Sequence, residues 1–173
     1  MRPRGYPRSP EPGADRLVGG VMDRVWLFYA VQLAASAYAL WRGGAPERLL
    51  GLALVVAAVS TQLLQDDQAV RFAGVELNVL LVDLALLGVM LAITLHADRF
   101  WPAWVTALHL LGTGAHLARA ISPDVIRLTY AVLAAVWSYP IMVLLVIGTV
   151  RHASRIRHRG WDLDWSRQDP TVR

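Results

Sequence analysis

The stretch FAGVELNVLLVDLALLGVMLAITL, residues 72–95, decides the fold. It is longer than the roughly 20 apolar residues with which an α-helix crosses the hydrocarbon core of a bilayer. Its two charged residues, Glu76 and Asp83, are two helical turns apart and lie on one face of a helix, which leaves the remaining surface apolar. The stretch therefore predicts a transmembrane helix.

Further apolar blocks occupy residues 25–41, 49–64, 103–118 and 128–150, and hydrophobic residues make up 55% of the chain. A soluble helical bundle would carry a charged face along each helix, whereas the block at 49–64 contains no charged residue. We therefore predict an all-α fold, a polytopic membrane helical bundle of about five transmembrane helices. The expected spans are residues 21–42, 46–65, 72–96, 101–120 and 126–150.

The two ends of the chain differ from this transmembrane bundle, which is expected over residues 21–150. Residues 1–20 contain four prolines and four glycines, and we expect them to form a disordered N-terminal tail. Residues 151–173 are expected to form a basic C-terminal tail, because the segment RHASRIRHRG has four arginines and no carboxylate. Trp161 and Trp165 in this tail are expected at the membrane interface, where tryptophan is enriched.

Arginines in short flanks favour the cytoplasmic side of a membrane. We therefore expect a multi-pass protein of the cell inner membrane with its C-terminal tail in the cytoplasm. Five spans place the two tails on opposite sides, and the arginines are nearly balanced, with eight on the N-terminal side and nine on the other. Two alternatives remain, in which one block does not span or the chain inserts in both orientations. The basic flank is accounted for as a topology signal, so we expect no nucleic-acid partner.

Polar side chains line one face of each of the two blocks that follow each other at 72–95 and 103–118. The polar face of the second block consists of Thr106, His109, Thr113 and His116. The stripe of the first block includes Glu76, Asp83 and Thr94. The connection HADRFWP is short and predicts an antiparallel helical hairpin, in which residues at equal depth have numbers that sum to roughly 198.

This construction places Asp83 level with about residue 115 and makes Asp83 and His116 expected partners. The next turn brings Tyr130 level with His116. We therefore predict a buried polar cluster of Asp83, His116, Glu76, His109 and Tyr130. A carboxylate and a histidine in a low dielectric form a pair whose proton affinity can be switched, so the cluster is a candidate for proton coupling. A purely structural pair is the alternative, because interhelical hydrogen bonds also hold membrane helices together.

Two smaller features bear on the packing of the helices. Pro140 lies inside the block at 128–150 and predicts a kink there, unless neighbouring helices accommodate it. Tyr29, Gln32 and Ser36 share a face of the first block and are expected to meet Ser60 and Thr61 of the second block.

The residues give little support to known catalytic or cofactor chemistry. The chain has no cysteine, which excludes disulfides, thiolate metal sites and iron–sulfur clusters. His109 and His116 share one helix and do not match the two facing imidazoles of a bis-histidine haem. Asp83, Glu76 and His116 are suitable types of metal ligand, but their spacing matches no known signature. We therefore expect no catalytic residue, no cofactor and no metal site.

The sequence favours a small, non-enzymatic integral membrane protein that packs against itself or against a larger membrane complex. One alternative is a proton-linked transporter or sensor of a small molecule that uses the Asp/His cluster. Another is a membrane-embedded enzyme or cytochrome. The expected partners are the lipid bilayer and either further copies of the chain or a larger complex.

Overall fold

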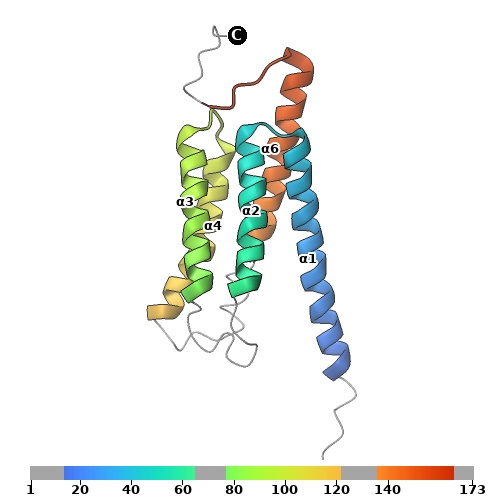
Figure 1. Ribbon diagram of the computed structural model, residues 1–173, viewed down its shortest axis with the longest axis vertical. Helices are drawn as coiled ribbons and strands as arrows, with labels where there is room; N and C mark the ends of the chain where they lie inside the picture. Colours follow the sequence, from blue (N-terminus) through green and yellow to red (C-terminus); the bar gives the residue numbers. More distant parts are fainter. Residues whose placement is uncertain (1–13, 65–76, 122–135, 166–173) are drawn as a thin grey trace, which may run out of the picture. The chain divides into compact units, whose positions relative to one another are not determined.

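The computed structural model describes residues 14–64, 77–121 and 136–165, and this part of the chain is all-α. Five helices are present in it (Figure 1): α1 (Ala14–Arg42), α2 (Ala45–Leu64), α3 (Leu77–His96), α4 (Trp101–Ile121) and α6 (Ser138–Arg159). Extended pairing in the described residues amounts to one isolated bridge between Ala97 and Trp165.

Two of the described helical segments, Ala45–Leu64 and Asn78–His96, are long and apolar enough to cross a membrane. The turn between α3 and α4 lies where the sequence predicted it, because α3 ends at His96 and α4 begins at Trp101. These two helices pack against each other as a hairpin.

The predicted tails are shorter than expected. Helix α1 begins at Ala14, so residues 14–20 are helical, because the proline-rich composition that predicted disorder ends at Pro12. Helix α6 continues through the arginines to Arg159 and ends at Gly160, whose φ of 78° is the left-handed conformation that glycine adopts without steric cost. Residues 151–159 of the predicted basic tail are therefore helical.

Pro140 marks a helix start and not a kink within one described helix. Helix α6 begins at Ser138, after the N-cap Trp137, so Pro140 lies in its first turn. Backbone N–H groups in the first turn have no partner within the helix, and proline is tolerated there for that reason.

The chain divides into two units, one ending at Val31 and the other beginning at Gln32. In the first unit, described from Ala14, the rings of Phe28 and Tyr29 meet edge to face with centroids 5.5 Å apart. The second unit holds the remainder of α1 and all the other helices.

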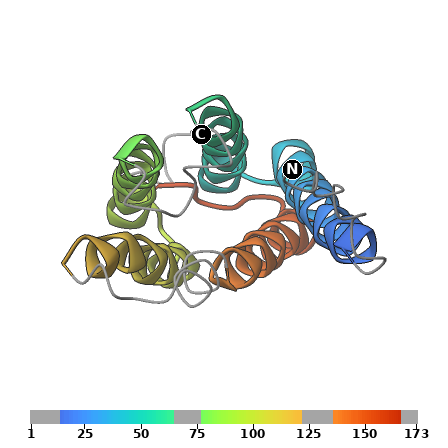
Figure 2. The same ribbon diagram turned by 90° about the horizontal axis from the view of Figure 1, so that it is seen from below.

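Helices α2, α3, α4 and α6 form a closed ring in that order, since each packs on the next and α6 packs on α2 (Figure 2). Met90, Val105 and Leu145 are almost completely buried in the core at its centre. Residues 32–42 of α1 lie against α2, where Gly51 leaves room for Ser36 and Ala39.

The contact of Gln32 with α2 differs from the predicted one. The side-chain amide of Gln32 donates to the backbone carbonyl of Leu54, at 2.9 Å, and not to Ser60 or Thr61. The hydroxyl of Ser36 is buried and has no hydrogen-bond partner among the described residues. The close approach of the backbones at Gly51 explains why Gln32 reaches the main chain of α2.

The outward faces of the helices in the second unit are apolar, while several polar groups are inside. Large apolar side chains are exposed on α2 (Leu49, Leu52, Val56, Val59, Leu63), α3 (Leu81, Leu84, Leu91, Leu95), α4 (Leu110, Leu111) and α6 (Val143, Ile147, Val150). Glu47, Thr113, Thr149 and His152 are buried. This distribution is the reverse of that of a typical soluble bundle.

Candidate functional site: a buried ion-pair network

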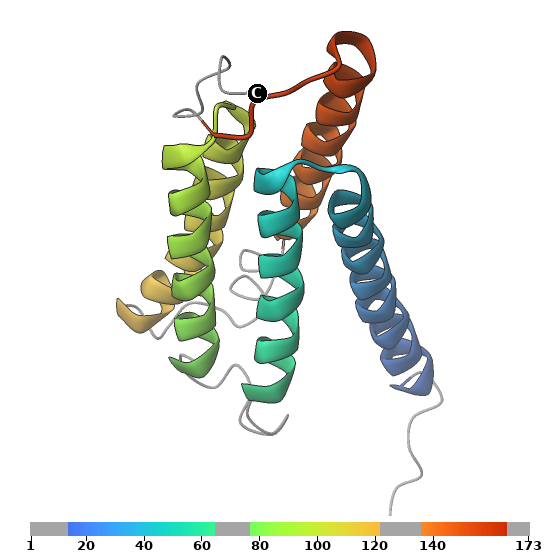
Figure 3. The same ribbon diagram turned by 45° about the horizontal axis from the view of Figure 1, so that its top comes forward.

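One end of the ring gathers three segments that are far apart in the sequence (Figure 3). They are the turn between α1 and α2, the turn between α3 and α4, and residues 161–165, which follow α6 and are called the strap here. The strap pairs with the α3–α4 turn through the bridge between Ala97 and Trp165 and through the N–H of Asp98, which donates to the carbonyl of Asp164 at 3.4 Å. Trp165 is partly buried against the core, so the strap is a packed segment.

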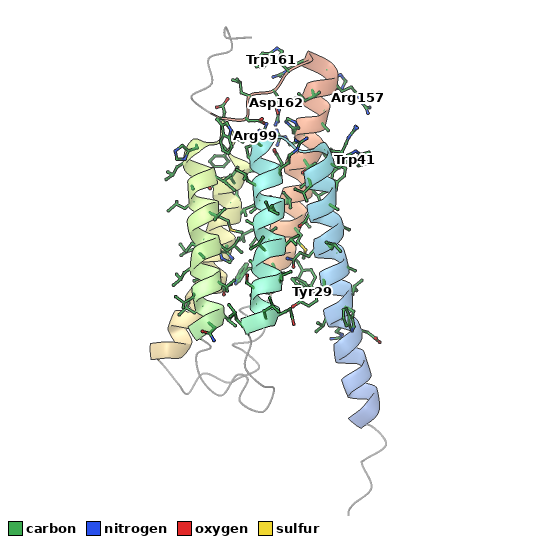
Figure 4. All side chains as sticks on the ribbon, in the orientation of Figure 1. Tyr29, Trp41, Arg99, Arg157, Trp161 and Asp162 are labelled. Carbon is green, nitrogen blue, oxygen red and sulfur yellow. The ribbon has the colours of Figure 1, made fainter. Side chains whose placement is uncertain are left out.

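Arg99, in the α3–α4 turn, is the centre of a network of charges at this end. Its guanidinium contacts both carboxylate oxygens of Glu47 from α2. It also donates to Asp162 Oδ2 at 2.7 Å, to Asp164 Oδ1 at 3.1 Å and to the carbonyl of Leu163 at 3.1 Å. Figure 4 shows Arg99 and Asp162 together at this end. One side chain thus connects α2, the α3–α4 turn and the strap.

Glu47 is fixed by the start of α2 as well as by Arg99. Its Oε2 accepts a hydrogen bond from the backbone N–H of Gly44, the residue just before the helix, at 3.1 Å. This is the backward half of a capping box, and a negative charge in the first turn is also stabilised by the helix dipole. The side chain of Glu47 is 0% exposed, so its charge depends on these partners.

Helix α6 adds His152 and Arg155, which both hold the strap through Asp162. Arg155 Nε donates to Asp162 Oδ1 at 2.7 Å. His152 Nδ1 lies 2.6 Å from Asp162 Oδ2 and 3.0 Å from Arg99 Nη2. A guanidinium only donates hydrogen bonds and a carboxylate only accepts them. Nδ1 of His152 therefore donates to Asp162 when it carries a proton, and it accepts from Arg99 when it carries none. The shorter distance favours the proton on Nδ1.

The electrostatic balance of the network depends on its carboxylates, its arginines and the charge of His152. Burial raises the pKa of Asp162, but hydrogen bonds from Arg155 and His152 and the charge of Arg99 outweigh this effect and hold the pKa below its ordinary value. Three carboxylates, Glu47, Asp162 and Asp164, face two arginines. Protonation of His152 would bring the sum of these charges to zero.

Glu47, His152 and Asp164 also present atoms of the types that bind metal ions, all within 4.8 Å of one another. The guanidinium of Arg99 donates to Glu47 and Asp164 and lies 3.0 Å from Nδ1 of His152. A positive charge therefore already lies among these atoms, and a divalent cation would have to compete with it. The arrangement is that of an ion-pair network.

The predicted polar cluster falls only partly within the described residues. His109 Nε2 lies 2.9 Å from the backbone carbonyl of Asp83, so these two predicted residues are together, although the contact shown is to the main chain. The side chain of His116, which belongs to α4, and the residues Glu76 and Tyr130 lie outside the described part. The pairing of Asp83 with His116 stays a prediction.

The two predicted polar faces do meet at other positions. Thr94 of α3 and Thr106 of α4 are joined by a hydrogen bond of 2.8 Å between their hydroxyl groups. Their numbers sum to 200, close to the value expected for the hairpin. Thr113, also on the predicted face, is buried and donates to the carbonyl of His109.

The network residues were not singled out by the sequence. Arg99 lies in the short connection HADRFWP, and Asp162 belongs to the segment that was expected to form a tail. Two signals point to them. Glu47 is one of only two charged residues in the apolar helix α2, and the strap WDLDW alternates aspartate with tryptophan or leucine in a pattern unusual for a solvated tail.

The fold and the site define a class of all-α protein with two helices apolar enough to cross a membrane and a buried ion-pair network at one end. Comparisons with models of known protein families, with curated proteins and with solved structures found no match.

Proposed function

We propose that the chain is a multi-pass, non-enzymatic protein of the inner membrane that acts as an accessory or homo-oligomeric component. Helices α2, α3, α4 and α6 would cross the bilayer together, with α1 as the fifth span. The observation that carries this proposal is the distribution of side chains in the second unit. Leucine and valine cover the outward faces, while Glu47 and Arg99 are buried. Water would disfavour this exposed apolar surface, whereas lipid would solvate it.

The charged groups of the network contact one another, which supports a structural role for them. Arg99, Arg155 and His152 each contact an acidic partner, and Glu47 and Asp162 each contact a cation. Groups that already satisfy one another are suited to fixing helix ends. An accessory subunit needs such a rigid frame, because its surface has to present a constant shape to its partner.

The orientation proposed for the protein places the network end in the cytoplasm. Exposed arginines gather on the segments at this end, namely Arg42, Arg48, Arg151, Arg157 and Arg159. Arginines beside membrane helices favour the cytoplasmic side. The C-terminal part of α6 and the strap would then lie at the cytoplasmic surface.

Two measurements test the membrane location and the orientation. Membranes from cells that produce the full chain would be washed with alkaline carbonate, and the protein should stay in the pellet. A reporter protein that functions only in the cytoplasm would be fused after Arg173, and it should be active. Release by carbonate would overturn the membrane proposal, and an exported reporter would overturn the orientation.

A further measurement tests the accessory role. The wild-type chain would be purified gently from its native membranes, together with a variant in which Arg99 and Glu47 are both replaced by methionine. Both proteins should retain the same stoichiometric partner or the same oligomeric state, because the pair is proposed to act only inside the fold. Recovery of the folded wild type as a monomer with no partner would contradict the accessory role.

A proton-linked carrier or sensor is the second candidate, and the contact of His152 Nδ1 with both Asp162 and Arg99 favours it. The partner of Nδ1 changes with its proton, so gain or loss of that proton would alter how the strap is held. In reconstituted vesicles, this candidate requires a substrate-dependent proton flux that His152→Gln abolishes. A flux that is unchanged in that variant would contradict it.

A further inference from the structure

A groove of about 510 Å³ runs between α4, α6 and the strap, and Arg99, Arg155 and Asp162 of the network form one part of its lining. Trp101 and Trp104 line its α4 side, and Trp161 of the strap closes one part. Leu144 and Ile147 of α6 line it farther along the helix. The volume is within the range of sites that bind small molecules, which is about 300–1,000 Å³.

Arginines give this groove a positive wall. Arg151, Arg155 and Arg159 are spaced four residues apart, so they share one face of α6, and all three line the groove. Arg155 forms an ion pair with Asp162. Arg151 and Arg159 are exposed and form no ion pair within the described part of the chain. The acidic residues of the lining are Asp98 and Asp162, and Asp162 is already paired with Arg99 and Arg155. Asp98 alone does not offset the charges of both Arg151 and Arg159, so a net positive charge remains for a ligand.

The groove changes from charged to apolar along α6. Arg151 is one turn from Ile147, which is exposed and continues into the apolar outer surface with Val143 and Val150. A ligand that fills the groove would therefore contact cations at one end and hydrocarbon at the other. Tryptophans between the two regions are typical of the boundary between headgroups and acyl chains.

We propose that this groove binds an anionic phospholipid of the surrounding leaflet. Its phosphate would lie at Arg151 and Arg159, and an acyl chain would lie along Leu144 and Ile147. An arginine donates several hydrogen bonds in a fixed geometry that matches phosphate oxygens. A soluble anion would leave the apolar half unused, and an apolar peptide would leave the two arginines unpaired. The proposal rests on the membrane location proposed above.

The test measures which lipids the protein retains. The full chain would be reconstituted in vesicles with equal amounts of phosphatidylcholine and phosphatidylglycerol, extracted in a mild neutral detergent, and the bound lipids quantified by mass spectrometry. Phosphatidylglycerol should be enriched at least tenfold over phosphatidylcholine. Each arginine near an anionic surface contributes a factor of about five, so Arg151→Gln with Arg159→Gln should remove most of the enrichment.

A matched control separates the groove from general surface charge. The pair Arg48→Gln with Arg157→Gln removes the same charge from exposed arginines that do not line the groove, and it should change the enrichment less than twofold. An equal loss in both double variants would overturn the proposal in favour of diffuse attraction to the membrane. Both variants should melt like the wild type in neutral detergent without lipid.

Two further outcomes distinguish a failure of the lipid site from a failure of the proposed membrane location. A protein that stays in the bilayer but retains both lipids equally would overturn the lipid site and leave the proposed function intact, whereas a protein released by carbonate would overturn the membrane location itself. Soluble glycerol phosphate should not raise the melting temperature, because it has no acyl chain. If it stabilised the protein as much as phosphatidylglycerol, the groove would be a phosphate site and the lipid proposal would be wrong.

Discussion

Arg99 and Glu47 form a buried ion pair between residues 52 positions apart, where the first turn of α2 meets the turn between α3 and α4. Their side chains are 4% and 0% exposed, so water solvates neither charge. Such a pair is stable while both members are present, since the loss of one leaves the other charge buried without compensation.

Replacement of Arg99 by methionine is therefore expected to lower the free energy of unfolding by about 3–5 kcal/mol. A second replacement, Glu47→Met, should recover most of this loss, because no isolated charge would then be buried. The measurement is the unfolding midpoint in mixed micelles, followed by circular dichroism. Arg157→Met is the control, because Arg157 is exposed and Figure 4 shows it apart from Arg99 and Asp162. Equal midpoints for the Arg99 and Arg157 variants would contradict the prediction.

The space at Gly44 leads to a second prediction. A Cβ atom added at Gly44 would collide with Asp164 Oδ1 and lie 2.8 Å from Cε1 of His152. Gly44→Ala is thus expected to displace the strap, which limited proteolysis would detect as faster cleavage near residue 163. Gly88→Ala is the matched control: nothing lies within 4 Å of its added methyl group, and alanine favours a helix over glycine by up to about 1 kcal/mol. Unchanged cleavage in Gly44→Ala would show that the strap tolerates the extra atom.

The pKa of Asp162 makes the strap sensitive to acid. This pKa is lowered in the folded protein, so the stabilisation is fully present above the unfolded value, about 3.9, and is lost as the pH falls through the folded value. The chain has no cysteine, so Trp161→Cys allows a single spin label on the strap. The label should be immobile at pH 7 and become mobile below about pH 4. In a labelled protein that also carries Asp162→Asn, the spin label should already be mobile at pH 7. If this substitution left the mobility of the label unchanged, the proposed role of the carboxylate would be wrong.

The hydrogen bond between Thr94 and Thr106 leads to a smaller predicted effect. Interhelical hydrogen bonds in membrane proteins contribute about 0.6 kcal/mol on average. A double-mutant cycle with Thr94→Val and Thr106→Val should give a coupling energy of this size, measured from unfolding midpoints. A coupling energy of zero would mean that the two hydroxyl groups stabilise their own helices only, through the carbonyls of Met90 and Pro102.

The sequence predicted the all-α fold and the hairpin well, because those features depend on local patterns. Apolar blocks separated by short polar connections locate α2, α3 and their turns directly. The pairing of the polar faces followed from helical spacing and the shortness of the turn, which is why Thr94 meets Thr106. Helix α6 begins at Ser138, which places Pro140 in its first turn, while the span predicted from residue 126 begins outside the described residues.

The contacts of the network do not follow from the sequence, because its members are distant in the chain. Arg99 is 63 residues from Asp162 and 53 from His152, and neither separation follows a helical or hairpin repeat. The return of the strap across the end of the ring decides these contacts. Basic residues around 151–159 favoured a solvated tail, whereas the decisive residues, Asp162 and Trp165, come just after them.

The bridging position of the strap also sets the order in which the protein can mature. A ribosome delivers Glu47 first, its cation Arg99 some 52 residues later and Asp162 another 63 residues after that. Until Asp162 emerges, Arg99 has Glu47 as its acidic partner but lacks the carboxylates of the strap. Assembly therefore finishes with its last described segment. A chain truncated before the strap would leave Arg99 without Asp162 and Asp164.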